Sequence, residues 1–377
     1  MKKNIMIIKS LQELISVGAV EEATEKNEYK KSTRKLSMHE LVLYLVIIAL
    51  EQSKSYRDAV TLATKYGLPE VHYSELSKRV SDMPFEVMKE ILEYFLEQCN
   101  RKFRRSINKV KGVKKAIKAV DSTIITTSKT QMKWAGYKGQ RSGVKLHVQY
   151  DVGTDMPTAT TESVAKRHDS KYADELKDEE SILVEDRAYG KTERFDSYLA
   201  TGQSFVIRIK DNLTVAWPRK LKHMPLDGSN IIDDITCQLG KGKKLTKNRF
   251  RVVSFKDNNG NVIKACTDLM NVNAETIAEI YKCRWEVESF FRFIKQNLNV
   301  SRIFGTTKNA VFNQLYAALL AYVIIRFLYN QTSAQWGRYV KLTMIEFIRA
   351  LRTNNFPTEV FVSINSLFGK LAFALGS

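Results

Sequence analysis

The sequence predicts a mixed α/β fold behind an all-helical N-terminal domain, and three observations support this prediction. Residues 1–110 carry apolar side chains at helical spacing. From residue 117 the pattern changes to short alternating segments typical of strands. From residue 274 helical spacing resumes and continues to the C-terminus. A run of strands with helices appearing late favours a mixed sheet with flanking helices.

Two helix starts are marked in the N-terminal part. Ser37-Met-His-Glu40 is a capping-box pattern directly before the apolar run 41–50. Pro84 suits the first turn of a helix over residues 85–103.

Two further helices, residues 56–66 and 73–80, flank Gly67-Leu68-Pro69. A helix, a short turn and a second helix are compatible with a helix-turn-helix that reads DNA. An ordinary helical hairpin gives the same pattern, so the sequence leaves both open.

The strands are predicted from alternation and from β-branched content, in five segments: residues 117–121, 144–151, 156–163, 181–186 and 204–209. A β-rich insertion follows, with a hairpin signal at Asp257-Asn-Asn-Gly260. The predicted domains are a helical domain with the candidate DNA-reading helices (1–112), the first part of a mixed α/β core (113–209), the β-rich insertion (210–272), core helices (273–332) and a C-terminal helical region (333–377).

Charge and composition narrow the class of protein. Lys and Arg number 60 against 41 Asp and Glu, a net charge of +19, which favours an anionic partner such as nucleic acid. The four cysteines form no CxxC pair and the five histidines no metal-ligand spacing, so a zinc site or a disulfide framework is not expected. The apolar stretch 310–328 is long enough to span a bilayer, but it carries Asn313, Gln314 and Arg326. We interpret it as a buried helix, with a membrane span as the lesser alternative.

Two aspartates are predicted at or just after the ends of strands. Asp121 follows Ala-Val and Asp186 follows Val-Glu. A strand holds its backbone rigidly, so its end can present a carboxylate at a sheet edge. Most such aspartates form turns or cap helices, so each is weak by itself.

A predicted helix over residues 281–295 supplies the third carboxylate. Four polar side chains fall within an arc of about 60° at 3.6 residues per turn, beside the apolar face: Tyr281, Arg284, Glu288 and Lys295. The rival Glu286 lies about 140° from Tyr281 on the same wheel. The wheel therefore favours Glu288, although Arg284 with Glu288 could also be a plain surface ion pair.

Three carboxylates suit one kind of chemistry. Phosphodiester cleavage needs an activated water and a stabilised leaving oxygen, and a pair of Mg²⁺ ions supplies both. Mg²⁺ prefers oxygen ligands, which Asp121, Asp186 and Glu288 would provide.

The chain resembles insertion-sequence transposases of the IS4 family, in the DDE superfamily. The Y-(2)-R-(3)-E-(6)-K signature of that family matches at Tyr281, Arg284, Glu288 and Lys295. Asp186-Arg-Ala-Tyr189 is similar to its second-aspartate block, and Ala-Val-Asp121-Ser-Thr to its first. The resemblance covers about residues 115 to 330 and implies an RNase H-like core split by a β-strand insertion.

The resemblance also implies roles for these residues. Asp121, Asp186 and Glu288 would be the metal-binding catalytic triad, with two Mg²⁺ ions and Mn²⁺ as a substitute. Tyr281, Arg284 and Lys295 would contact DNA phosphates. Studied members stack a flipped base on a tryptophan near the β insertion, and Trp217 is the only tryptophan placed there. His147 and the His168-Asp169 pair lie near polar positions of the family, outside its signature.

The expected function is a cytoplasmic, nucleoid-associated transposase that cuts at the ends of its insertion sequence and joins the 3′-hydroxyl ends to target DNA. The partners would be double-stranded DNA, as terminal inverted repeats and as target, with a dimer on the paired ends and no membrane. Two alternatives stay open: an RNase H-like nuclease without strand transfer, and a catalytically inactive DNA-binding protein.

Overall fold

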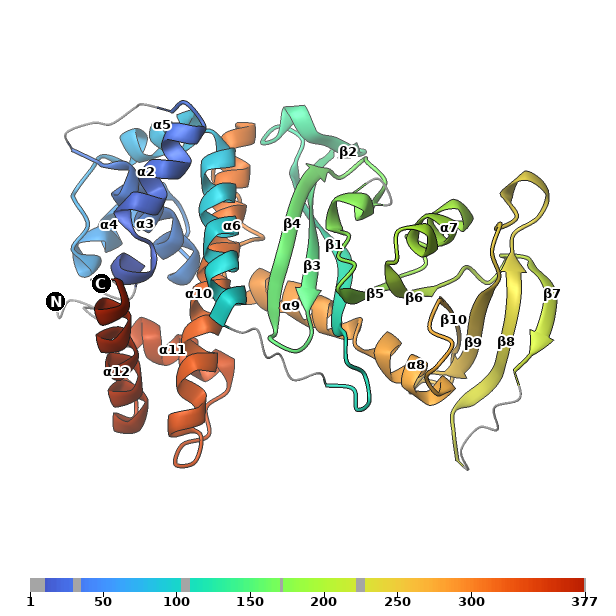
Figure 1. Cartoon of the computed structure of the whole chain (residues 1–377). Coiled ribbons are helices and arrows are strands. Elements are labelled where there is room, and N and C mark those ends of the chain that lie inside the picture. Colours follow the sequence, from blue (N-terminus) through green and yellow to red (C-terminus); the bar gives the residue numbers. More distant parts are fainter. Residues whose placement is uncertain (1–10, 30–34, 103–108, 170–171, 222–227, 376–377) are drawn as a thin grey trace. The chain divides into compact units, whose positions relative to one another are not determined.

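A computed structural model describes residues 11–29, 35–102, 109–169, 172–221 and 228–375 of the chain. It divides into two compact units, seen in Figure 1. Unit 1 comprises Met1–Lys102, Ile125–Gly143 and Arg292–Ser377, and unit 2 comprises Phe103–Ile124 and Val144–Phe291. The chain therefore passes between the units several times, whereas the predicted domains are consecutive segments.

Unit 1 is mainly helical. Its helices are α2 (Val17–Lys26), α3 (Met38–Leu50), α4 (Tyr56–Ala63), α5 (Tyr73–Asp82), α6 (Phe85–Lys102), α10 (Lys308–Trp336), α11 (Met344–Thr353) and α12 (Thr358–Leu375). The predicted capping box is confirmed at the start of α3: Ser37 and Glu40 each accept a hydrogen bond from the backbone N–H of the other.

Helix α10 forms the centre of this unit. Within the described residues it is the one helix long and apolar enough to cross a membrane, and 94% of its apolar window is buried. It packs against α3, α6 and α12, as a core helix that is apolar on all sides does. Its buried Asn313 donates hydrogen bonds to the carbonyls of Val80 (3.0 Å) and Met83 (2.8 Å). The prediction of a buried helix is confirmed.

The connection between α4 and α5 covers residues 64–72, including the 3₁₀ turn η1 (Thr64–Tyr66). A helix-turn-helix of the DNA-reading type has a turn of about three to four residues. The longer connection favours the ordinary helical hairpin.

The strands of the described residues form one mixed sheet (Figure 1). They are β1 (Ala116–Ser128), β2 (Gly136–Lys138), β3 (Arg141–Asp151), β4 (Met156–Val164), β5 (Ser181–Glu185), β6 (Ser204–Arg208), β7 (Val215–Lys220), β8 (Ile231–Leu239), β9 (Phe250–Lys256) and β10 (Val262–Thr267). Apart from β2, the strands that precede the β-rich insertion have the order β4-β3-β1-β5-β6. Among them β3 and β4 form an antiparallel hairpin, while β1, β5 and β6 are parallel.

The β-rich insertion extends this sheet. Strands β7, β8, β9 and β10 pair with one another in antiparallel fashion, and β10 also pairs antiparallel with β6 of the core. The predicted hairpin at residues 257–260 joins β9 and β10, with Asp257 accepting hydrogen bonds from the N–H groups of Asn259 and Asn261.

Three helices complete the core: α7 (Thr192–Ala200), α8 (Ala274–Lys282) and α9 (Trp285–Asn297). Helix α7 lies in the crossover between β5 and β6. It packs Phe195 and Tyr198 onto a buried cluster with Phe205 and Phe250. This apolar layer fixes β5, the strand that leads into Asp186.

Candidate active site

The two predicted aspartates lie next to each other at the end of a parallel strand pair. The last residue pair of the β1–β5 ladder is Val120 with Glu185. The next residue along the chain is an aspartate in both cases: Asp121 within β1 and Asp186 just after β5. Neighbouring strands are about 4.8 Å apart, so the two carboxylates start from adjacent backbone positions.

The prediction that Asp121 ends its strand is wrong. β5 stops at Glu185, but β1 continues through Asp121 to Ser128. The residues that follow, Thr-Ile-Ile-Thr-Thr at 123–127, are all β-branched and favour extended backbone. The parallel ladder ends at Val120, whereas the strand itself does not.

The prediction of one continuous helix over residues 281–295 is also wrong. α8 ends at Lys282 and α9 begins at Trp285. At the break the N–H of Arg284 donates to the carbonyl of Tyr281 (3.0 Å), and that of Glu286 to Cys283 (3.1 Å). These are tight three-residue turns in place of helical bonds. Tyr281 therefore does not share a regular wheel with Glu288, although Arg284 still reaches Glu288 four residues on.

Arg284 lies near all three predicted carboxylates and pairs with two of them. Its Nη1 forms an ion pair with Glu288 and lies 3.9 Å from Oδ2 of Asp121. Burial lowers the pKa of the Arg284 guanidinium. Tyr281, Glu288 and Asp186 act in the opposite direction and bring this pKa above its usual value. The side chain is only 8% exposed, unlike a plain surface ion pair. Asp121 and Glu288 therefore lie against one buried cation, and Asp186 is near enough for its charge to act on that cation.

The rival Glu286 has a different partner. Its carboxylate lies 3.4 Å from Nζ of Lys109, which also binds Asp155 at 2.9 Å. Lys109 thus ties the start of α9 to the β3–β4 hairpin. Glu286 takes part in this tie, while Glu288 faces Arg284.

Burial and the neighbouring charges change the pKa of Asp121. Burial raises the pKa of Asp121 to about 6, and the negative charges of Glu288 and Asp186 act in the same direction. The N–H of Ser122, 2.7 Å from Oδ1, and the charge of Arg284 oppose the shift. The site therefore holds more negative charge than its own cation balances.

Two tyrosines beside the carboxylates have buried hydroxyls without a hydrogen-bond partner of good geometry, Tyr189 and Tyr281. Burial raises the pKa of both, and the charges of Asp121 on Tyr189 and of Asp186 on Tyr281 raise it further. Buried polar groups are normally paired, so such atoms suit a site that contacts a ligand. Tyr189 was missed as a site residue, although it stands in the Asp186-Arg-Ala-Tyr189 block.

The donor set fits a divalent cation in chemistry and in charge. Three carboxylates offer oxygen ligands, which hard cations such as Mg²⁺ prefer. Among the described residues, however, no group of three His, Cys, Asp or Glu side chains is arranged closely enough to hold a metal ion. Arg284 holds Glu288 and faces Asp121 instead.

The two remaining predicted residues lie elsewhere. Lys295 is two turns beyond Glu288 on α9, in the part of that helix that belongs to unit 1. Trp217 lies on β7, five strand spacings from β5 in the sheet order, or roughly 24 Å at 4.8 Å each. The ladder therefore does not place Trp217 beside the carboxylates of its own chain.

A pocket of about 770 Å³ in unit 2 borders the site. The β9–β10 hairpin and α8 line it, together with Tyr281, Trp285 and Glu286. Trp285 is 53% exposed and stacks against Arg284, whose guanidinium lies 5.0 Å from the ring centre. Sequence reasoning missed it, although an aromatic residue between Arg284 and Glu288 was a visible signal.

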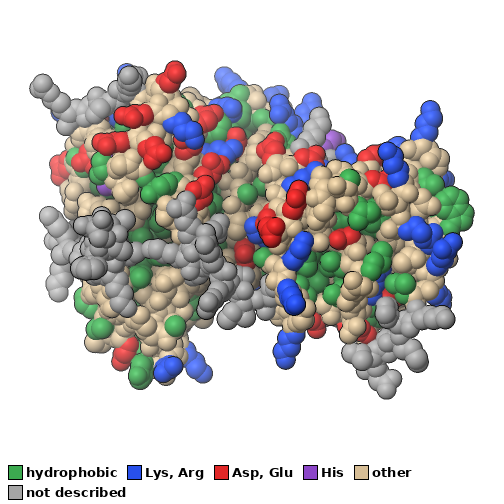
Figure 2. Space-filling view, in the orientation of Figure 1, with side chains coloured by type: hydrophobic (Ala, Val, Ile, Leu, Met, Phe, Trp, Pro, Cys, Tyr) green, Lys and Arg blue, Asp and Glu red, His purple; other side chains and the backbone are tan. Residues whose placement is uncertain are grey.

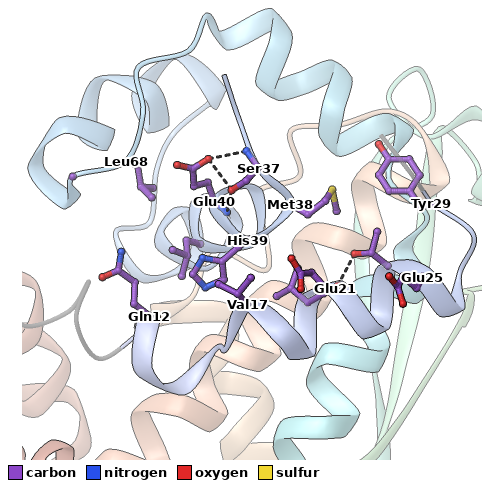
Figure 3. Close-up of a pocket in the computed structure, with 14 residues that line it drawn as sticks. Gln12, Val17, Glu21, Glu25, Tyr29, Ser37, Met38, His39, Glu40 and Leu68 are labelled. Atoms are coloured by element: carbon purple, nitrogen blue, oxygen red, sulfur yellow. Dashed lines mark hydrogen bonds between the residues drawn. The ribbon is translucent and has the colours of Figure 1, made fainter. Parts of the chain in front are cut away.

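A second pocket, of about 580 Å³, belongs to the helical unit (Figure 3). Residues from α2, including Glu21 and Glu25, and from α3, including His39, line it. None of the predicted catalytic residues is among them.

The fold and the carboxylate cluster agree with a match to a known family. Residues 113–324 match the sequence model of the family described as "Transposase DDE domain". The chain belongs to this family of DDE transposases.

Two relatives of the chain are also described as transposases. The chain is 40% identical over 359 residues, 95% of its length and 94% of the other, to a protein described as the probable transposase of insertion sequence element IS5377 from Geobacillus stearothermophilus. It is 27% identical over 238 residues, 60% of its length and 64% of the other, to a transposase ascribed to element IS4SA of Synechocystis sp. (strain ATCC 27184 / PCC 6803 / Kazusa). A cryo-EM structure of the piggyBac transposase synaptic complex with hairpin DNA aligns at a TM-score of 0.46 with 11% identity, over 96% of this chain and 84% of that one.

Proposed function

We propose that this protein cleaves DNA at the ends of its insertion sequence and joins the 3′-hydroxyl ends to target DNA, with Asp121, Asp186 and Glu288 as catalytic residues. One observation carries the proposal: the parallel ladder ends directly before two aspartates, and Arg284 links the first of them, Asp121, to Glu288. Membership of the DDE transposase family supports it.

Asp121, Asp186 and Glu288 would hold a divalent cation, with a pair of Mg²⁺ ions as the expected complement and Mn²⁺ as a substitute. When bound, such ions activate the attacking water and stabilise the leaving oxygen. The rigid β1–β5 pair holds two of the ligands in place before DNA arrives. Three carboxylates beside one arginine leave excess negative charge, which favours binding of a cation; the charges of Glu288 and Asp186 add to the effect of burial, which raises the pKa of Asp121 to about 6.

The positive and aromatic side chains would bind and orient the DNA. Arg284 offers five donors in a planar fork that suits phosphate oxygens. The Tyr281 hydroxyl, buried and without a hydrogen-bond partner of good geometry, could donate to a phosphate oxygen beside it. Lys295, seven residues after Glu288 on α9, would contact a DNA phosphate.

The β-rich insertion offers a second DNA contact. Trp217 is 63% exposed and has a positive φ of 48°, at an irregularity in the β7–β8 pairing that turns it outward. Further exposed basic residues lie on β7 itself and in the connection between β8 and β9, which contains η5 (Gly242–Lys244): Arg219, Lys220, Lys241, Lys243, Lys244 and Lys247. Lys and Arg side chains are visible over this end of the molecule in Figure 2. An exposed tryptophan among cations suits base stacking and phosphate binding. Because Trp217 is five strand spacings from β5, the DNA that contacts Trp217 and the DNA at the carboxylates would occupy separate places on one chain, as in a dimer on paired ends.

Strand transfer separates this proposal from its nearest alternative. The full chain would be incubated with Mg²⁺, a duplex carrying the terminal repeats of the element, and a target plasmid. We expect cut ends and joined products. Cleavage without joined products would favour the nuclease without strand transfer.

A pair of variants on one helix tests the assignment of the triad. Glu288→Gln should abolish cleavage while leaving DNA binding intact, because it removes one carboxylate of the cluster. Glu286→Gln is the matched control, since it changes a carboxylate two residues away that pairs with Lys109. If Glu288→Gln cleaves as well as Glu286→Gln, the triad is wrongly assigned; if it loses DNA binding instead of cleavage, an inactive DNA-binding protein is favoured.

A further inference from the structure

A partly buried polar network adjoins Asp121, on residues outside the family signature. Its centre is Asp169, in the segment that follows β4. One oxygen of Asp169, Oδ1, accepts a hydrogen bond from the hydroxyl of Ser122 (2.8 Å) and an ion pair from Nζ of Lys145 (2.9 Å). Nδ1 of His147 lies 3.6 Å from the same oxygen.

The strands explain why these groups meet. Lys145 and His147 are two residues apart on β3, so their side chains lie on the same face of the sheet. Both are almost completely buried, at 7% and 0% exposed. Lys145 also donates to the carbonyl of Arg167 (2.9 Å), so its ammonium is anchored at two points.

His147 closes the network on the far side. Its Nε2 lies 2.9 Å from Oγ of Ser163, and its ring stacks on Tyr172 with centres 4.4 Å apart. Burial lowers the pKa of His147 to about 4, so the ring is neutral near pH 7. The tautomer with the proton on Nδ1 points that N–H toward Asp169 and leaves Nε2 to accept from Ser163.

Ser122 connects this network to the active site. Its hydroxyl is held by Asp169, and its backbone N–H donates to Oδ1 of Asp121 at 2.7 Å. With Oδ1 held in this way, Oδ2 is the oxygen of Asp121 that faces Arg284. The position of the Asp121 carboxylate therefore depends on the backbone at Ser122.

We propose that Asp169 is a positioning residue for Asp121, acting through the side chain and the backbone N–H of Ser122. Lys145 holds Asp169, with the His147 ring beside it, Asp169 holds Ser122, and Ser122 presents Asp121 to the cation that it binds. The inference rests on the proposed function, because it assumes that Asp121 is a metal ligand. Partners behind a ligand typically change metal affinity or activity by about 10- to 100-fold.

The test measures binding of Mn²⁺ to the full chain by calorimetry, beside the Mg²⁺ concentration for half-maximal cleavage. Ser122→Ala and Asp169→Asn should each weaken Mn²⁺ binding about tenfold and raise that Mg²⁺ concentration. The double variant should be no weaker than either single one, because both changes break the same link. Ser122→Thr keeps a hydroxyl and should bind nearly as the wild type does.

The control is Ser128→Ala, which removes a hydroxyl on the same strand that pairs only locally, with Thr130. It should leave Mn²⁺ binding unchanged. Wild-type binding in Ser122→Ala would overturn the inference, as would equal loss in Ser122→Thr and Ser122→Ala. Asp121→Ala separates the two proposals: if it leaves Mn²⁺ binding intact, the proposed metal site fails, whereas its loss with unchanged Ser122→Ala rejects the positioning role alone.

Discussion

Glu185 gives a stability prediction whose size follows from the structure. It is the last residue of β5, and its side chain is completely buried beside Tyr198, whose hydroxyl donates to Oε1 at 3.1 Å. Oε2 has no hydrogen-bond partner. Burial raises the pKa of Glu185 to about 7, against the opposing charge of Arg194 and the hydrogen bond from Tyr198.

The sign follows from proton linkage. The folded state holds the proton of Glu185 more tightly than the unfolded state, whose ordinary pKa is 4.5. The stabilising contribution is therefore complete below pH 4.5 and is lost as the pH rises to about 7. The difference between the two pKa values corresponds to about 3 kcal/mol.

Glu185→Gln removes this titration and keeps an acceptor for Tyr198. The unpaired amide donors cost about 1–3 kcal/mol at every pH, because they are neutral. We therefore expect the free energy of unfolding of the variant, relative to the wild type, to rise by about 3 kcal/mol between pH 4.5 and pH 8.

The assay is urea unfolding of both proteins at pH 4.5, 6 and 8, followed by the far-ultraviolet circular dichroism. Since the chain has two units, the difference between the two proteins at each pH is the quantity to compare. A difference that stays constant from pH 4.5 to pH 8 would refute the reasoning, because it would mean that Glu185 titrates as it does in water.

Three further outcomes are expected. Asp234→Asn should lower the free energy of unfolding by about 3–5 kcal/mol, because it leaves the fully buried Arg251 without its carboxylate; a loss below 1 kcal/mol in urea unfolding would contradict this. Ser37→Ala removes the cap of α3 and should cost about 1 kcal/mol, measured as a lower thermal midpoint, with Ser37→Thr as the control. Trp217→Ala should weaken binding of the terminal-repeat duplex by about fivefold or more in a gel-shift assay, because base stacking contributes about 1–3 kcal/mol. The thermal midpoint should not change, because the side chain is exposed. Equal binding by the variant and the wild type would exclude Trp217 as a base-stacking residue.

Local signals in the sequence predicted most of the elements and failed where a contact between distant residues decides. The start of α3 follows from Ser37 and Glu40 alone, because a capping box is a contact within one turn. The break before Trp285 contains neither Gly nor Pro, so periodicity could not indicate it. The end of the β1–β5 ladder at Val120 depends on which strand pairs with which, and the apolar run of β1 does not contain that information.

The site divides in the same way. The predicted preference for Glu288 over Glu286 came from one helix, and the structure gives Glu286 a separate partner in Lys109. The Asp169 network could not be predicted, because Ser122 and Asp169 are 47 positions apart and meet only when β3, β4 and β1 assemble. Trp217 was placed by its insertion alone, and nothing local in the sequence indicates how many strands separate it from Asp186.

The charge balance of the site connects fold and function. Three carboxylates lie near one buried arginine. Burial is the main cause of the raised pKa of Asp121, and the negative charges of Glu288 and Asp186 add to it. A folded core could lower this electrostatic cost by replacing one carboxylate with an apolar or amide side chain. The chain instead keeps all three and anchors Asp121 through Ser122 and Asp169. A site that binds a cation needs oxygen ligands held in fixed positions and an excess of negative charge, which the bound cation then neutralises.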